Sequence, residues 1–152
     1  MQKQHWGNAM RRLAILSLAF ALCAPVVAMA DNAMSLGVYL WTDPDHDPVK
    51  AQFLSVANGT SETEIDGPEG SKSDTHPTTP DELRLLTATI KEQMAALSME
   101  RKPMPTGGYI TVDWHYSTDT GYADGSTTFA LDAVPASVQA LQMAAFGATL
   151  SK

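Results

Sequence analysis

The alternation of hydrophobic and polar positions predicts three strands in the first half of the chain, over residues 35–41, 51–57 and 61–66. Successive side chains of a strand point to opposite faces of its sheet. Both faces of the first segment are apolar, which favours a central strand or one that is covered on both sides. The pair Asn58-Gly59 separates the second segment from the third and is typical of a two-residue hairpin turn.

The hydrophobic pattern then stops. Residues 67–78 contain Gly, Pro, Ser, Thr, Lys, His and acidic residues, and no large apolar side chain. A segment of this composition has nothing to bury against a core. We therefore expect a mobile loop over residues 67–78.

The clearest helix signal begins at Thr79. Its hydroxyl is suited to cap a helix, Pro80 stands at the first helical position, and Glu82 follows three residues after the cap. The apolar positions that follow recur at spacings of three or four and predict one buried stripe, made of Leu83, Leu86, Ile90, Met94 and Leu97. Gln93 falls outside this stripe.

Period-two alternation returns over residues 109–116, where Ile110, Val112, Trp114 and Tyr116 share one predicted face. Residues 126–132 are the natural partner strand. The segment 117–125 between them has two interpretations, an extended hairpin closed by a tight turn at Asp124-Gly125 or a loop. The pattern does not choose between them.

A second helix is predicted to begin at Pro135 and to end at Gly147. Its expected inward side chains are Val138, Leu141, Ala145 and Phe146.

The resulting order is strand-strand-strand-helix-strand-strand-helix. It predicts an α+β fold of two layers, in which a mostly antiparallel sheet of four or five strands carries two helices on one face. We expect residues 31–152 to form this single small domain. The span from the capped helix to the Pro135 helix resembles, in element order, the emfourin-type proteinaceous inhibitors of metalloproteases. That resemblance rests on no shared motif and carries no residue across.

The first thirty residues are predicted to be a secretory signal peptide. Arg11 and Arg12 precede an apolar run over residues 13–27, and Ala28-Met-Ala30 is a small-x-small cleavage site. The run is shorter than the ~20 residues that span a bilayer. We therefore expect a periplasmic or secreted protein, cleaved near Ala30, with no stable membrane insertion afterwards.

Loss of this leader would make the chain more acidic. The full sequence has a formal charge of −7, and removal of Lys3, Arg11 and Arg12 would leave seven Lys and Arg against seventeen Asp and Glu, a charge of about −10. Such a surface disfavours nucleic acid and favours a cationic protein partner. The single cysteine, Cys23, would leave with the leader, so no disulfide is expected.

The segment DPDHDP, residues 43–48, alternates acidic residues as calcium-binding loops do. Such loops also need a glycine at the sixth position and a glutamate at the twelfth. Here these positions are Pro48 and Leu54, so the calcium-loop interpretation fails.

Two interpretations of DPDHDP stay open. One is a zinc or copper site that combines Asp45, His46 and Asp47 with the distant pair Asp113 and His115. The other is a polar surface loop whose acidic residues and prolines end the first strand.

Catalytic patterns are weak. The sequence lacks a Gly-x-Ser-x-Gly elbow and a glycine-rich phosphate loop, and the mature chain would lack cysteine. Glu62 and Glu64 are the obvious paired carboxylates, but alternating acids are more typical of a solvated edge strand. An enzyme is therefore not favoured.

Recognition is the hypothesis that best fits the remaining features. Aromatic residues beside polar ones are typical of protein interfaces. The candidate binding surface comprises Trp41, Tyr109, Asp113, His115 and Tyr122. We expect a small, exported, acidic, non-enzymatic protein-binding module without a cofactor, such as an inhibitor, an immunity-like protein or an accessory protein. The alternative is an extracytoplasmic zinc or copper binder.

Overall fold

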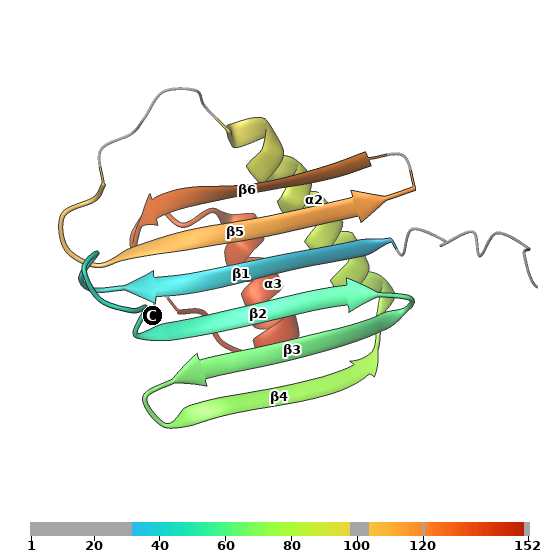
Figure 1. Cartoon of the computed structure of the whole chain (residues 1–152), viewed down its shortest axis with the longest axis horizontal. Helices are drawn as coiled ribbons and strands as arrows, with labels where there is room; N and C mark the ends of the chain where they lie inside the picture. Colours follow the sequence, from blue (N-terminus) through green and yellow to red (C-terminus); the bar gives the residue numbers. More distant parts are fainter. Residues whose placement is uncertain (1–31, 98–103, 120, 151–152) are drawn as a thin grey trace, which may run out of the picture.

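The computed structural model describes residues 32–97, 104–119 and 121–150. These residues form a six-stranded, fully antiparallel sheet and two helices (Figure 1). The predicted α+β class and antiparallel sheet are therefore confirmed. In chain order the elements are β1 (Ala33–Trp41), β2 (Lys50–Ala57), β3 (Thr60–Gly67), β4 (Gly70–Pro77), α2 (Pro80–Ala96), β5 (Tyr109–Thr118), β6 (Gly121–Ala130) and α3 (Ala136–Phe146).

The spatial order of the strands is β4-β3-β2-β1-β5-β6. The first four strands follow one another as a meander, and α2 then crosses behind the sheet so that β5 pairs with the free edge of β1 (Figure 1). Leu36 of β1 stands opposite both Leu54 and Trp114. The first strand is therefore central, as its two apolar faces predict.

The prediction of four or five strands was wrong, because residues 70–77 form the edge strand β4 and not a mobile loop. Its side chains are exposed except for His76, which is half-buried. The strand therefore needs no apolar residues, and its sequence shows no hydrophobic pattern. Backbone pairing with β3 defines this strand instead, from Thr60 opposite Pro77 to Gly67 opposite Gly70. An edge strand without apolar residues carries no period-two signal.

Residues 117–125 belong to an extended hairpin, but the predicted turn at Asp124-Gly125 was wrong, because both residues pair with β5 inside strand β6. β6 begins at Gly121, which pairs with Thr118 at the end of β5. The pairing continues without a break to Ala130 opposite Tyr109.

The buried face of α2 differs from the predicted stripe. Leu83, Met94 and Leu97 are 41%, 40% and 49% exposed. The buried face instead includes polar residues at both ends of the helix. The Glu82 amide donates a hydrogen bond to Thr79 Oγ1 in the cap, and Gln93 accepts a hydrogen bond from Thr127 of β6. The residues that α2 buries are Glu82, Leu86, Thr89, Ile90 and Gln93.

The predicted face of α3 is largely confirmed. Val138 and Leu141 are buried, and Ala145 and Phe146 pack against the core while partly exposed. Gly147 ends the helix with a left-handed backbone, φ 70°, which glycine adopts without steric cost.

Both helices lie on the same face of the sheet (Figure 1). The core lies between them and the strands, and Leu36, Val38 and Val112 at its centre are at most 2% exposed. Among the described residues, no helix covers the opposite face of the sheet, so that face is available for a functional site.

The predicted signal peptide, residues 1–30, lies outside the described residues. Of the helices that the structure describes, neither combines the length and the apolarity required to cross a bilayer.

Candidate binding surface

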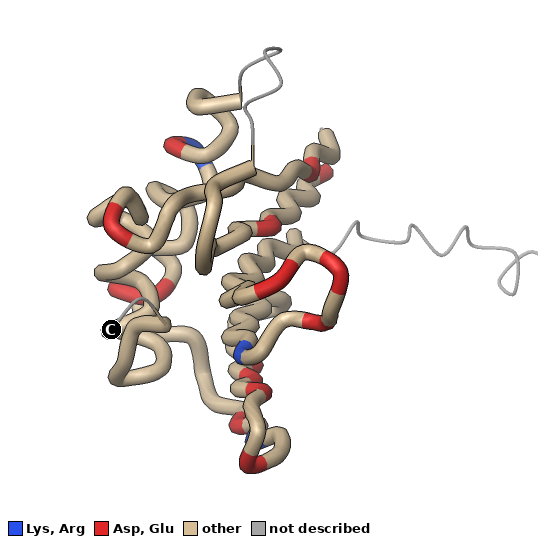
Figure 2. The backbone as a smooth tube through the Cα atoms, turned by 90° about the vertical axis from the view of Figure 1, so that its left-hand side faces the viewer, with Lys and Arg blue, Asp and Glu red and all other residues tan. Residues whose placement is uncertain are grey.

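We call the sheet surface opposite the helices the open face. Because side chains alternate along a strand, it comprises the odd-numbered residues of β1, β2, β4 and β5 and the even-numbered residues of β3 and β6. Figure 2 shows the helices on one side of the sheet and the acidic loop of residues 42–49 projecting on the other. That loop therefore borders the open face.

The open face is acidic. Among the described strand residues on it, none is Lys or Arg, and Lys50 and Lys72 occupy positions on the helix side. Its acidic side chains are all exposed. They are Glu62, Glu64 and Asp66 on β3, Asp113 on β5 and Asp124 on β6.

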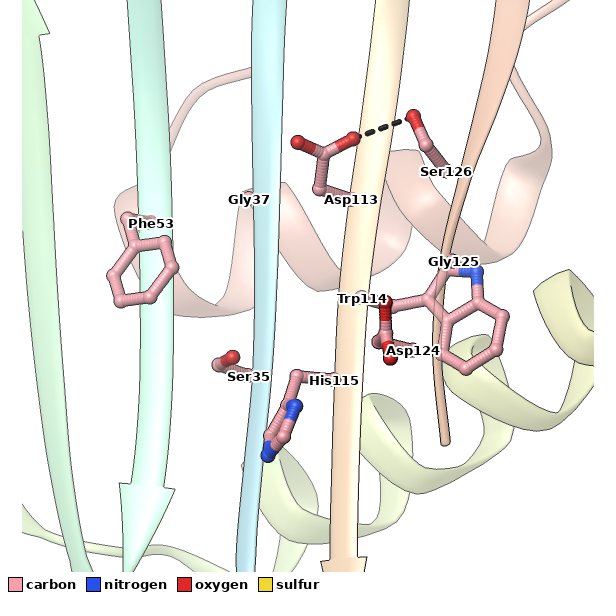
Figure 3. A pocket seen from close by; sticks show the side chains of 9 residues that line it. All are labelled: Ser35, Gly37, Phe53, Asp113, Trp114, His115, Asp124, Gly125 and Ser126. Atoms are coloured by element: carbon pink, nitrogen blue, oxygen red, sulfur yellow. Dashed lines mark hydrogen bonds between the residues drawn. The ribbon is translucent and has the colours of Figure 1, made fainter. Parts of the chain in front are cut away.

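A shallow hollow of about 460 Å³ lies at the centre of the open face. Figure 3 shows Phe53 on one side of β1 and Asp113 and His115 on the other, with the small residues Ser35 and Gly37 between them. The full lining consists of Ser35, Gly37, Phe53, Asp113, Trp114, His115, Asp124, Gly125 and Ser126.

Gly37 is one of the residues that line the hollow, and its neighbours on the two adjacent strands are Phe53 on β2 and Asp113 on β5. The Tyr39 side chain leans back over Gly37, and a Cβ at residue 37 would lie 2.6 Å from the Tyr39 hydroxyl. Burial, and then the Asp113 carboxylate, raise the pKa of Tyr39. A glycine inside a strand often marks such a close approach.

Asp113 is oriented by a neighbour on the next strand. Its Oδ1 accepts a hydrogen bond of 2.6 Å from the Ser126 hydroxyl (Figure 3). No described residue donates a hydrogen bond to Oδ2. One side of an exposed carboxylate is therefore fixed by the fold while the other side stays available to solvent.

His115 has a different neighbourhood. It stands between Ser35 of β1 and Asp124 of β6 in the register. The Tyr122 ring meets it edge-on, at a centroid distance of 5.1 Å and an interplanar angle of 65°. A hydrogen bond and the negative charge of Asp124 raise the pKa of Tyr122.

Trp41 and Tyr109 lie at the end of the open face where β1 ends, away from the hollow. Their rings are stacked, 6.0 Å between centroids and 7° between planes. The Trp41 indole Nε1 donates to Thr111 Oγ1 at 2.8 Å. Tyr109 is only 3% exposed, so it supports Trp41 and offers almost no surface itself.

The five residues of the predicted binding surface thus share one face but form three groups. Trp41 and Tyr109 lie at one end, Asp113 and His115 at the centre, and Tyr122 against His115. The hollow also uses residues that the prediction did not include. These are Ser35, Gly37, Phe53, Trp114, Asp124, Gly125 and Ser126.

The segment DPDHDP forms a self-contained turn. Asp43 Oδ1 accepts a hydrogen bond from the Asp45 backbone amide at 3.0 Å, and Asp43 Oδ2 lies 2.9 Å from His46 Nδ1. Aspartate side chains stabilise turns in this way without any ligand. The geometry supports the interpretation of DPDHDP as a surface loop that ends β1.

The structure does not bring the predicted metal ligands together. Ser35, opposite His115, precedes Trp41 by six residues, which is about 20 Å of strand, and His46 lies beyond Trp41. In the part of the chain that is described, no group of three or more His, Cys, Asp or Glu side chains could hold a metal ion. Zinc or copper binding stays a prediction without a ligand group to support it.

A second polar cluster joins β4 to α2. His76 Nε2 lies 2.8 Å from Glu82 Oε1, and His76 Nδ1 lies 3.2 Å from Asp74 Oδ2. Glu82 Oε2 accepts a hydrogen bond from the Thr79 amide at 2.9 Å, completing the predicted capping box. These contacts attach the edge strand to the start of the helix, so we call the cluster the β4–α2 latch.

The latch shifts both of its central groups. The hydrogen bond to Glu82 raises the pKa of His76, and burial opposes that rise. Burial acts to raise the pKa of Glu82, but the hydrogen bonds from Thr79 and His76 outweigh it and lower the pKa. Each group therefore favours the charged form of the other.

Comparison with protein-family models, characterised proteins and solved structures finds no match to this chain. The emfourin-like order of elements therefore gains no support.

Proposed function

We propose that this protein is a small, exported, non-enzymatic module that binds another extracytoplasmic protein through its open face. One observation carries the proposal: a broad sheet surface that no described helix covers presents aromatic and acidic side chains around a central hollow. Aromatic groups beside polar ones are the composition that protein interfaces favour. Inhibitor, immunity-like and accessory roles all fit such a module.

The architecture suits this role. In the proposal the protein has two layers, with α2 and α3 as the stabilising layer and the sheet as the recognition layer. The core that stabilises the fold lies between the layers, so side chains on the open face are not needed to fill the core. The leader, residues 1–30, would direct export and be removed near Ala30.

The charge of the open face favours a cationic partner. Its exposed carboxylates have no Lys or Arg beside them among the described strand residues of that face. The same charges would repel nucleic acid and anionic lipid headgroups. A basic patch on a protein is therefore the partner chemistry that we propose.

Affinity capture with matched variants tests this function. Purified residues 31–152, which contain every described element, would be immobilised and exposed to the extracytoplasmic fraction of the source cells. We expect a specific protein that binds the wild type and the control Glu92→Lys, an exposed position on α2. Glu64→Lys and Asp113→Lys, which place a positive charge on the open face, should lose it.

Two outcomes contradict the proposal. One is retention of the same protein by all four forms, which would place the interface elsewhere. The other is the absence of any specifically retained protein.

A further inference from the structure

We propose that the outer edge of β6 is a strand-addition site, at which an extended segment of the partner protein that carries lysine or arginine pairs with the sheet. This inference rests on the proposed function and deepens it, because it names the kind of segment that is bound and how it is bound. It follows from the position of β6, from the residues that β6 lacks and from the charge that β6 carries.

β6 is one end of the sheet. In the order β4-β3-β2-β1-β5-β6 it pairs, among the described residues, with β5 alone (Figure 1). An end strand has a neighbour on one side only, so every second amide and carbonyl along it points away from the sheet. Extended peptides bind to such a row of backbone groups by adding one more strand.

The β6 edge is long and regular. The strand contains ten residues, whereas strands of five or six are usual. Its pairing with β5 runs without a shift in register, from Gly121 opposite Thr118 to Ala130 opposite Tyr109. A bulge would shift that register and turn the edge away from an incoming strand. The backbone of β6 therefore offers an unbroken line for pairing.

β6 also lacks the residues that protect exposed edges. Natural sheets place lysine or proline on an edge strand, or cover the strand, to discourage pairing. The other edge strand, β4, contains Lys72 and Pro77, and its His76 contacts Glu82 of α2. β6 contains no Lys, Arg or Pro, and its one charged residue is Asp124. The two edges of the sheet thus differ, and β6 is the edge that is open to pairing.

Asp124 selects the charge of the incoming strand. It is exposed on the open face, in the same cross-strand row as His115. An added strand would place one of its own side chains about 5 Å from Asp124 on that face. Opposite charges in such a pair are favourable and like charges are unfavourable. Lysine or arginine therefore suits this position of the added strand.

Tyr122 offers an aromatic contact beside this charge. Its side chain is 68% exposed, the largest fraction among the exposed large hydrophobic side chains. Tyr122 and Asp124 are two residues apart on one strand, so their side chains lie on the same face. The alkyl stem of a lysine or arginine that reaches Asp124 can lie along the Tyr122 ring, with its charge near the ring face.

A second copy of this protein is a poorer occupant. Antiparallel pairing of two β6 edges would place two open faces side by side on one continuous sheet. Each open face carries exposed carboxylates and, among its described strand residues, no Lys or Arg. The whole sequence has a formal charge of −7. Repulsion between two such surfaces disfavours the pair, whereas a cationic segment of another protein is attracted.

Peptide titrations followed by nuclear magnetic resonance test the edge. The probe is a short end-blocked peptide that alternates lysine with valine, so that its lysines share one face. We expect saturable shifts of the β6 amides and slower hydrogen exchange there, at a dissociation constant on the order of 1 mM. The same peptide methylated on its backbone amides keeps its side chains and charges but cannot donate to the edge, and should bind about tenfold more weakly.

Charge changes on both molecules give matched controls. The peptide with glutamate in place of lysine should bind more weakly than the lysine peptide. Asp124→Asn removes the charge at the edge with little change in size and should weaken binding of the lysine peptide by about threefold. Glu92→Gln removes an equal charge at a remote exposed position on α2 and should leave binding unchanged.

Five results would overturn the strand-addition site. They are no saturable binding, equal binding of the methylated peptide, shifts that fall on β4 and not on β6, tighter binding of the glutamate peptide, and equal losses in Asp124→Asn and Glu92→Gln. Shifts of the β6 amides when the protein alone is concentrated would assign this edge to a second copy and would also overturn the proposal.

The capture experiment separates this inference from the proposed function. If a captured partner leaves the hydrogen exchange of the β6 amides unchanged, the proposed function stands and the strand-addition site falls. If the lysine peptide pairs with β6 as expected and no protein is captured, the strand-addition site stands and the proposed function falls.

Discussion

The two faces of this sheet are built from the same strands but carry opposite chemistry. Leu54 and Phe53 are neighbours on β2, yet Leu54 is fully buried against the helices while Phe53 is 36% exposed on the open face. Burial of apolar area stabilises the helix-covered face. The open face places like charges near one another, and that arrangement adds no stability.

This difference shows which side chains the fold explains and which it leaves for function. Side chains such as Leu36 and Val112 are explained completely by the core that they fill. Asp113 and Phe53 are not needed for that core, so their placement calls for another explanation. Variants that compare the two faces can break or sharpen this separation.

The largest contrast is expected between Leu54→Ala and Phe53→Ala. Removing the fully buried Leu54 side chain should lower the free energy of unfolding by about 2–5 kcal/mol, because a cavity is left in the core. Removing Phe53 should lower it by less than about 1 kcal/mol, since its ring already contacts solvent. Urea denaturation followed by circular dichroism measures both. Equal losses would show that the open face is also structural.

Two glycines offer the next contrast. A Cβ at residue 125 would lie 2.5 Å from the ring of Trp114, which is only 4% exposed. Gly125→Ala should therefore overpack the core and destabilise the protein by about 1–3 kcal/mol. A Cβ at residue 37 would meet the hydroxyl end of the half-buried Tyr39 side chain, at 2.6 Å.

Tyr39 can swing away from that contact, so Gly37→Ala should change the stability by less than about 1 kcal/mol, within the range of the usual glycine-to-alanine effect. Thermal melting of the two variants gives the comparison. A larger loss for Gly37→Ala than for Gly125→Ala would contradict the assignment of the two faces.

The same contrast shows what the sequence could predict. Helix-side residues of β1 and β5, such as Leu36 and Trp114, form regular period-two patterns because burial selects them, and those strands were predicted correctly. β4 buries no side chain, so its sequence had no pattern to detect. The face of α2 was misjudged because Glu82 and Gln93 are buried through hydrogen bonds, which hydrophobic periodicity does not register.

The hollow was only partly predictable for a similar reason. Asp113 and His115 were recognised because ionisable side chains are candidate site residues by their type alone. Gly37 and Phe53 are ordinary alone, and only the strand register brings them side by side. Their one local signal was irregularity: a glycine within a strand, and a phenylalanine on the polar side of another.

A third prediction concerns the β4–α2 latch, which belongs to the helix-covered side. The pKa of His76 is raised in the folded state, so its contribution is complete below about pH 6.5, its ordinary value, and is lost as the pH rises through the folded pKa. The lowered pKa of Glu82 gives a contribution that is present above pH 4.5 and lost as the pH falls. Stabilisation by the latch should therefore be greatest between these values.

His76→Gln should remove that dependence. Relative to the variant, the wild type should lose up to about 1 kcal/mol of stability between pH 6 and pH 8, the size expected of a partly exposed ion pair. Urea midpoints across this window measure the difference. His46→Gln, which replaces a more exposed imidazole bonded to Asp43, is the matched control and should keep the wild-type slope. Identical slopes in all three proteins would show that the latch does not couple to pH.

The smallest expected effect bears most directly on the open face. Glu64 stands between Glu62 and Asp66 on the exposed side of β3, about 7 Å from each along the strand. Glu64→Gln removes this repulsion and keeps an acceptor for the Ser71 hydroxyl. We expect it to raise the free energy of unfolding by roughly a few tenths of a kcal/mol in low salt, and the melting temperature slightly with it. The gain should vanish near 1 M salt, where charges are screened within about 3 Å. If Glu64→Gln instead destabilised the protein at every salt concentration, these carboxylates would be structural, and their presence on the open face would no longer point to a cationic partner.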